Sequence, residues 1–316
     1  MLLDLPPMQA LTFYFDDFAR FRNSIFVKGW AHGPEKPTFV DATLTGTHVV
    51  ASTFRAVDDM SHLGKLGDIS SGFELQILTS SITDLKELTL DLRLSSGRTV
   101  TLAWEDINKR FGEHTPRYTL WRRYQEMVAE EDVRRMLDIG GRARSGIFRA
   151  DRFPNLKVDV LDIIADHGVT HVGDAHMTSQ IVGRHAYDAI MTTSVFEHLV
   201  MPWKVAVEMN LALKPGGFAF VHTHQSIGMH DMPWDFYRFS NSAWSGLFNK
   251  ATGFEIIGTE MADMNYIIPC HWESRHADVE DARGFESSAV LVRKIGEPTV
   301  DWGLSAADVT QDMYPA

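Results

Sequence analysis

The chain has 316 residues, of which 44% are hydrophobic, and its formal net charge is −12. This length exceeds what one hydrophobic core usually occupies, and the apolar content excludes a disordered chain, so we expect two folded domains. The acidic charge disfavours DNA and RNA as partners, because phosphate backbones repel a negative surface.

Residues 1–112 are predicted to form a small all-β sandwich domain. Apolar and polar side chains alternate with period 2 in 73–77 and 88–94, and short turns follow at Thr45-Gly46 and Ser95-Ser96-Gly97. This pattern is typical of antiparallel strands. The expected strands cover residues 24–31, 39–44, 48–54, 73–77, 88–94 and 98–104.

Residues 113–316 are predicted to form an α/β domain with a doubly wound, Rossmann-like sheet. Leu120, Tyr124 and Val128 recur at helical spacing, and another helix follows Pro202. The segments between the helices are short and apolar, which favours parallel strands. The first five expected strands are Arg135–Ile139, Lys157–Leu161, Thr170–Val172, Tyr187–Thr192 and Phe218–His222.

The C-terminal part is expected to contain one more helix and two more strands. The helix is predicted over 241–251, and the strands over 255–258 and 288–294. A long polar loop, residues 263–285, is expected between these strands, and it contains His271, Trp272 and His276.

Basic side chains are concentrated between positions 122 and 144. Acidic residues interrupt them, so we expect ion pairs on the surface rather than a nucleic-acid site. The residues are Arg122, Arg123, Arg134, Arg135, Arg142 and Arg144.

The chain carries no pattern typical of a secreted or membrane protein. Its first 18 residues lack a basic start and a cleavage site, and no apolar run approaches the roughly 18–20 residues that span a bilayer. The single cysteine, Cys270, excludes an intramolecular disulfide. We therefore expect a cytoplasmic protein without a membrane span, and the sequence leaves a homo-oligomer open.

Carboxylates follow three successive predicted strands. Asp138 precedes Gly140 and Gly141, Asp162 ends the second strand, and Asp174-Ala175 follows the third. The carboxyl ends of parallel strands form the ligand-binding edge of such sheets, where Asp162 is suited to accept both ribose hydroxyls. The alternatives are a simple turn at the glycines and helix N-caps at the two later aspartates.

The segments LDIGG, VLDI, VGDA, YDAIMTTSVFEHL and LKPGGFAFV, between Arg135 and Val221, resemble class I S-adenosylmethionine-dependent methyltransferases. The resemblance implies the sheet order 3-2-1-4-5-7-6 with an antiparallel strand 7, and S-adenosylmethionine as cofactor. It also implies that Ser194 and Glu197 lie at the cofactor site. For Glu197-His198, a polar pair at a helix start is the alternative.

One loop departs from the family. Arg142 and Arg144 stand at positions where glycines are usual, which puts the loop shape in doubt. A nicotinamide dehydrogenase is disfavoured as well, because the G-x-G-x-x-G pattern that admits a pyrophosphate is missing.

The chain after the fifth predicted strand is expected to bind substrate. The run from His230 to Ser240, HDMPWDFYRFS, resembles a stretch in methyltransferases of surface-polysaccharide biosynthesis. The aromatic side chains of this run either pack the loop or stack on a sugar, and packing is favoured. The predicted substrate-binding residues are Gln225, His230, Asp231, Trp234, Tyr237 and Arg238.

Methyl transfer to a hydroxyl group requires a base. His222 and His224 share a face at period 2 and are the first candidates, followed by His198. A divalent metal held by the nearby histidines and Asp231 is the less favoured alternative, and we assign no metal.

The N-terminal segment FVKGWAHGPEKPTFVDATLTG, with Arg55 and SGFELQI, resembles β-sandwich modules of bacterial glycan assembly. Together the two resemblances imply O-methylation of a sugar, surface glycan or glycolipid. A noncatalytic adenosylmethionine- or glycan-binding partner in an assembly complex is the alternative.

Overall fold

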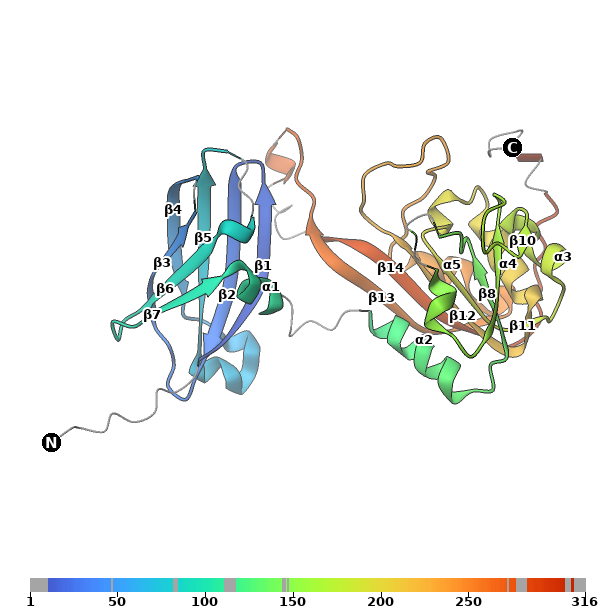
Figure 1. Ribbon diagram of the computed structural model, residues 1–316, viewed down its shortest axis with the longest axis horizontal. Coiled ribbons are helices and arrows are strands. Elements are labelled where there is room, and N and C mark those ends of the chain that lie inside the picture. The colour runs from blue at the N-terminus through green and yellow to red at the C-terminus, as the bar shows by residue number, and fades with distance from the viewer. Residues whose placement is uncertain are drawn as a thin grey trace. The chain divides into compact units, whose positions relative to one another are not determined.

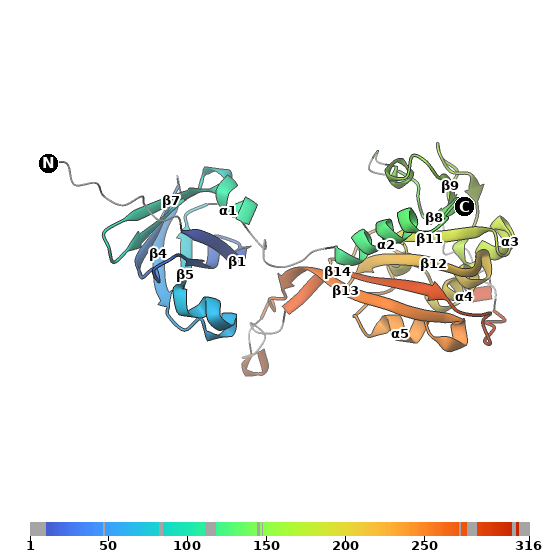
Figure 2. The same cartoon turned by 90° about the horizontal axis from the view of Figure 1, so that it is seen from below.

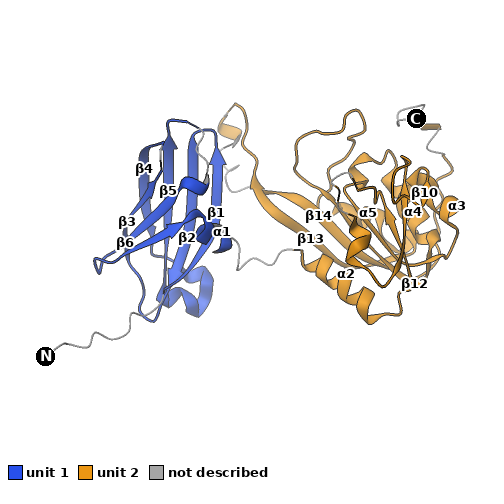
Figure 3. Ribbon diagram, in the orientation of Figure 1, with its two compact units in different colours: residues 1–116 blue, residues 117–316 orange. Residues whose placement is uncertain are grey.

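The computed structural model describes residues 11–46, 48–81, 85–110, 118–143, 146, 148–271, 273–276, 283–304 and 308–309. The chain divides into two compact units, Met1–Pro116 and Arg117–Ala316 (Figure 3). No helix among the described residues is long and apolar enough to cross a membrane.

Unit 1 consists of two antiparallel sheets around one hydrophobic core (Figure 1). One sheet has the order β1-β2-β5-β4 and the other β3-β6-β7, and Phe15, Leu75 and Leu90 are core residues from both. The elements are β1 (Thr12–Phe21), β2 (Ser24–His32), β3 (Phe39–Thr45), β4 (Val49–Val57), η1 (Ser61–Ile69), β5 (Ser70–Thr79), η2 (Leu85–Glu87), β6 (Thr89–Leu94), β7 (Thr99–Ala103) and α1 (Trp104–Arg110).

Two features of unit 1 differ from the predicted strands. Strand β1 was not expected, because a register shift between Phe15 and Asp17 interrupts the alternation of its side chains. The Thr45-Gly46 turn does not join paired strands, since β3 pairs with β6 and β4 with β5. It instead carries the chain from one sheet to the other.

Unit 2 is an α/β domain built on one seven-stranded sheet, which confirms the predicted Rossmann-like class. The sheet order is β10-β9-β8-β11-β12-β14-β13; all neighbours are parallel except β14, which is antiparallel to β12 and β13. The elements are α2 (Thr119–Glu130), β8 (Arg135–Ile139), η3 (Arg149–Arg152), β9 (Lys157–Asp162), β10 (His171–Val172), η4 (Ala175–Met177), α3 (Thr178–Val182), β11 (Tyr187–Thr193), η5 (Phe196–His198), α4 (Pro202–Ala212), β12 (Leu213–His224), α5 (Ala243–Leu247), η6 (Lys250–Thr252), β13 (Phe254–Tyr266), η7 (Ser274–His276) and β14 (Arg283–Lys294).

Helices cover both faces of this sheet, as Figure 2 shows for α2 on one face and α5 on the other. Tyr124 of α2 packs in one core with Phe218 and Phe220 of β12. Trp244 of α5 and Val205 of α4 belong to a separate core on the opposite face. The central strands β8, β11 and β12 are therefore covered on both faces, whereas the edge strand β13 is largely half-buried or exposed.

The long loop expected over 263–285 is shorter than predicted, because strands occupy both of its ends. Strands β13 and β14 continue as a paired ladder to Tyr266 and Arg283. Their outer part has no apolar alternation, but Glu260 accepts hydrogen bonds from the backbone nitrogens of Thr119 (2.7 Å) and Leu120 (3.0 Å), which ties β13 to α2. Backbone pairing and this cap, rather than hydrophobic patterning, define the hairpin. Trp272 lies outside the described residues.

The helix expected over 241–251 is shorter than predicted. Helix α5 covers only 243–247, and a separate turn, η6, follows it. Asn249 interrupts the helix because its side chain caps η6, accepting from the backbone nitrogens of Ala251 and Thr252.

Candidate active site

The carboxyl ends of neighbouring parallel strands meet at one edge of the unit 2 sheet. Backbone hydrogen bonds join these ends: Gly140 N donates to Leu161 O (2.7 Å), Gly173 N to Asp162 O (2.9 Å) and Ser194 N to His222 O (2.9 Å). The segments predicted to bind cofactor and substrate therefore lie along one edge.

Asp138 is buried at the end of β8, with 1% of its surface exposed. Arg149 forms three hydrogen bonds with it, Nη2 to Oδ1 at 2.9 Å and Nε to Oδ2 at 3.1 Å and to Oδ1 at 3.3 Å, and also donates to Gly140 O at 2.8 Å. Burial raises the pKa of Asp138, although the charge of Arg149 opposes the shift. Arg149 was not among the predicted site residues, because it belongs to no recognisable sequence motif.

The two glycines are explained by contacts inside the protein. Gly140 has a φ of 70°, and a Cβ atom there would lie 2.2 Å from Val195 Cγ2. A Cβ atom on Gly141 would lie 2.5 Å from Asp138 Oδ2. These contacts favour glycine at both positions, and the predicted role of Gly140 and Gly141 in cofactor binding stays a prediction.

Asp162 and Asp174 both accept hydrogen bonds from backbone nitrogens two residues further along the chain. Asp162 Oδ1 accepts from Ile164 N at 3.0 Å, and Arg142 Nε lies 3.6 Å from the same oxygen. Asp174 caps η4, which begins at Ala175, and its Oδ1 lies 2.6 Å from His176 Nδ1. The helix-cap alternative is therefore present at Asp174 but wrong for Asp162, which no helix among the described residues follows before β10.

Glu197 is fully buried beneath a group of histidines. The Thr223 hydroxyl donates to its Oε2, while Oε1 has no hydrogen-bond partner among the described residues. The Nε2 atoms of three histidines surround Oε1, at 3.3 Å for His224, 3.8 Å for His198 and 4.0 Å for His230. The structure thus brings together residues that lie far apart in the sequence.

His222 lies beside this group but does not belong to it. Its ring is 6.4 Å from that of Tyr118, between centroids, and its Nδ1 is buried without a hydrogen-bond partner among the described residues. Burial lowers the pKa of His222 to about 4, so its imidazole is neutral at pH 7. Burial also lowers the pKa of His224.

The loop between β12 and α5 is held by its own polar side chains. Arg238 binds both oxygens of Asp235 (2.6 and 2.7 Å) and the carbonyl groups of Ile227 and Gly228. Gln225 Oε1 accepts from Phe285 N at 2.7 Å. Arg238 and Gln225, predicted to bind substrate, thus hold the loop in place, and Asp235 was missed because its partner is only visible in the fold.

The remaining predicted loop residues differ in their surroundings. The Tyr237 hydroxyl donates to Val200 O at 3.0 Å, and Trp234 O accepts from His198 at 2.6 Å. Asp231 has a φ of 49° and accepts from Trp234 N at 3.1 Å. Phe239 stacks on Trp244 with a centroid distance of 5.0 Å, so this aromatic residue packs the loop against the hydrophobic core that contains Trp244.

Most residues of the basic segment form ion pairs, as predicted. Arg123 contacts Glu126 and Glu130, while Arg134 contacts Asp132. Arg135 contacts Asp159, and Arg142 lies near Asp162 and Asp166. Arg144 lies outside the described residues.

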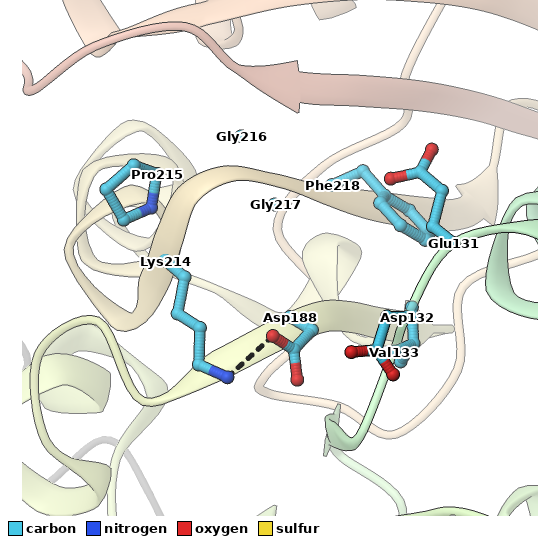
Figure 4. Close-up of a pocket in the computed structure, with 9 residues that line it drawn as sticks. All are labelled: Glu131, Asp132, Val133, Asp188, Lys214, Pro215, Gly216, Gly217 and Phe218. Carbon is cyan, nitrogen blue, oxygen red and sulfur yellow. Dashed lines mark hydrogen bonds and ion pairs between the residues drawn. The ribbon is translucent and has the colours of Figure 1, made fainter.

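A hollow of about 170 Å³ is present at the opposite edge of the sheet (Figure 4). It lies by the amino ends of β8, β11 and β12, and its Lys214 and Asp188 form an ion pair of 2.6 Å. Asp188 also accepts from Arg134 N and Arg135 N. Its other carboxylates pair with residues beside the hollow, Glu131 with Arg293 and Asp132 with Arg134, and none of the predicted site residues lines it.

The sequence matches no family model and no curated protein. Solved structures with a similar fold include a SAM-dependent methyltransferase from Archaeoglobus fulgidus, with 15% identity, 55% of this chain and 91% of that chain covered, and a TM-score of 0.42. A putative methyltransferase from Bacillus halodurans has 15% identity and a TM-score of 0.41, with 56% of this chain and 98% of that chain covered. The 1,6-didemethyltoxoflavin-N1-methyltransferase of Burkholderia thailandensis has 14% identity and a TM-score of 0.40, with 58% of this chain and 81% of that chain covered.

Proposed function

We propose that unit 2 is an S-adenosylmethionine-dependent methyltransferase. The observation that carries the proposal is the sheet: numbered within unit 2, its strands follow the order 3-2-1-4-5-7-6 with strand 7 antiparallel, the order that the sequence resemblance implies. Asp138, Asp162 and Ser194 lie along the carboxyl edge of this sheet, where open α/β sheets bind ligands.

The chemistry of this edge suits the cofactor. Asp162 offers carboxylate oxygens to the two ribose hydroxyls, and Arg149 offers guanidinium donors beside Gly140 for a carboxylate group. When bound, S-adenosylmethionine supplies an electrophilic methyl group, and the protein aligns the acceptor with it.

We assign proton removal to the histidines at the end of β12. His222 is neutral near pH 7 and borders Ser194 through the backbone, so its imidazole is suited to accept a hydroxyl proton. His224 is the second candidate and His198 the third. The acceptor class, a sugar, surface glycan or glycolipid, rests on the run from His230 to Ser240, and unit 1 is assigned to the same glycan context.

Labelled S-adenosylmethionine tests the proposal. The purified chain should bind S-adenosylhomocysteine in calorimetry, and label should pass from the cofactor to one member of a panel of nucleotide sugars and surface glycans. Failure to bind S-adenosylhomocysteine would remove the methyltransferase assignment.

A noncatalytic binding role is the second candidate, because Arg142 stands where a glycine is usual and lies beside Asp162, while Arg149 pairs with Asp138. Binding of S-adenosylhomocysteine without label transfer to any acceptor would favour this role.

A further inference from the structure

The buried side chain of Glu197 has one oxygen, Oε1, without a hydrogen-bond partner among the described residues. Glu197 has 0% of its surface exposed, and no lysine or arginine forms an ion pair with it among the described residues. An isolated buried carboxylate is strongly unfavourable unless a positive charge lies next to it. Its Oε1 points at three imidazole rings instead of a permanent cation.

The hydrogen bonds of two of these rings fix where their lone pairs point. His198 Nδ1 donates to the carbonyl of Trp234 at 2.6 Å, and His230 Nδ1 lies 3.2 Å from the carbonyl of Gly228. Because a carbonyl only accepts, each neutral ring carries its proton on Nδ1 and its lone pair on Nε2. Metal-binding histidines are commonly oriented in this way.

Glu197, His224 and His230 each offer a ligand atom, and these three atoms lie within 4.8 Å of one another. In a tetrahedral site with bonds of about 2.0–2.1 Å, neighbouring ligand atoms lie about 3.3–3.4 Å apart. The distances from Glu197 Oε1 to the three Nε2 atoms are 3.3, 3.8 and 4.0 Å. His224 already lies at this separation from Oε1, and His230 lies slightly beyond it.

We propose that Glu197, His224 and His230 form a binding site for one divalent transition-metal ion of the zinc class. Two imidazole nitrogens and one carboxylate oxygen are ligands typical of zinc and of Co²⁺, and they are less suited to Mg²⁺, which prefers oxygen. This ligand set differs from the metal site considered in the sequence analysis, because neither Asp231 nor His222 is among its ligands. The proposal does not depend on methyl transfer.

The ion would also join separate parts of unit 2. Glu197 lies in η5, His224 ends β12, and His230 belongs to the following loop. The backbone nitrogens of Phe236 and Tyr237 donate to Glu197 O at 2.8 and 3.2 Å. Metal binding would therefore fix the loop to the carboxyl edge of the sheet.

Metal titration of the full chain tests the site without any assay of activity. After treatment with a chelator and its removal, the protein should take up one Zn²⁺ per chain in calorimetry, and Co²⁺ should give the absorption bands of a tetrahedral complex. His230→Gln and His224→Gln should each weaken Zn²⁺ binding by more than the roughly 10–100-fold that loss of an outer partner costs. Zn²⁺ should also raise the thermal midpoint of the wild type.

His171→Gln is the matched control, because the side-chain exposure of His171, 28%, is close to the 31% of His230. It should bind Zn²⁺ like the wild type. Absence of Zn²⁺ and Co²⁺ uptake would overturn the proposal in favour of a proton shared between Glu197 and a histidine. Wild-type affinity in both His230→Gln and His224→Gln, each folded by circular dichroism, would overturn it too.

Discussion

Asp162 is the residue on which cofactor binding depends most directly in our proposal. We expect Asp162→Ala to weaken binding of S-adenosylhomocysteine, because a charge-assisted contact to the ribose would be lost. Such a contact contributes about 1.5–3 kcal/mol, or roughly 10–150-fold in affinity. Calorimetry on the folded variant measures this change.

Asp166→Ala serves as the control for Asp162→Ala. Asp166 also lies near Arg142, with Arg142 Nη1 at 3.7 Å, but half of its side chain is exposed. The Asp166→Ala variant should bind S-adenosylhomocysteine with the affinity of the wild type. Equal losses in the two variants would assign the effect to Arg142 rather than to the ribose contact.

The histidines of β12 carry the prediction for catalysis. His222→Ala or His224→Ala should slow methyl transfer by roughly 10²–10⁴-fold, the usual contribution of a general base. Cofactor affinity should stay nearly unchanged, since neither side chain is placed at the ribose. Single-turnover assays with labelled cofactor and the true acceptor measure the rate.

The two histidine variants should differ in their affinity for a divalent metal ion. His224 lies 3.3 Å from Glu197 Oε1 and takes part in the proposed metal site, whereas His222 does not. Loss of activity with a chelator, restored by a divalent metal, would favour a role for the ion in the reaction. Wild-type turnover in both variants would exclude them as the base and make Glu197 and His198 the next candidates.

At the level of elements, one buried carboxylate joins three strands of the unit 2 sheet. Asp159 of β9 accepts from Arg135 of β8 at 2.7 Å and from the Tyr187 hydroxyl of β11 at 2.9 Å. Burial raises its pKa, but these hydrogen bonds outweigh burial, and the net pKa is lowered. The charged form is therefore the one that stabilises the fold.

Asp159→Asn should consequently reduce the free energy of unfolding by about 1.5–3 kcal/mol at pH 7, the range for hydrogen bonds to charged groups. A lowered native pKa contributes stability above the unfolded pKa of about 4, and this contribution disappears as the pH falls through the native pKa. The difference between wild type and variant should therefore narrow in urea titrations from pH 7 towards pH 3.

Asp132→Asn provides the comparison. Asp132 forms an ion pair with Arg134, but 77% of its side chain is exposed, and solvent screens such pairs. We expect a change within about 0.5 kcal/mol. A difference for Asp159→Asn that is constant with pH would contradict the assignment to the carboxylate charge.

Local patterns were sufficient to predict the buried parallel strands of unit 2. Arg135–Ile139 was predicted with its observed limits, and the helix after Pro202 ends at Ala212, just before Lys214-Pro215-Gly216-Gly217. Continuous apolar runs and helix-ending residues are local signals. The outer part of the β13–β14 hairpin has neither signal and could not be predicted this way.

The site was predictable only in part for a similar reason. The strand-end positions of Asp138 and Asp162 follow from the order of the strands. The contacts of Arg149 with Asp138, of Asp235 with Arg238, and of the histidines with Glu197 depend on the paths of the loops. Those paths are set by packing and long-range hydrogen bonds, which a single sequence does not specify.

At the scale of the whole molecule, each unit has a hydrophobic core of its own. The core of unit 1 contains only residues from the N-terminal strands, α1 and their connections, while the two cores of unit 2 flank the seven-stranded sheet. A domain with its own core is expected to fold alone. The predicted boundary after residue 112 and the division after Pro116 differ by four residues.

A fragment of residues 1–116 should therefore fold without unit 2. We expect β-type circular dichroism and one cooperative thermal transition, because the two sheets bury Phe15, Leu75 and Leu90 against each other at 0% exposure. Phe15→Ala in the same fragment should lower its stability by about 3–5 kcal/mol, the usual cost of removing a buried phenylalanine. A small domain has little stability in reserve, so this variant should be largely unfolded at 25 °C. An unfolded or aggregated wild-type fragment, with full-length protein that unfolds in a single transition, would instead mean that the two units fold only together.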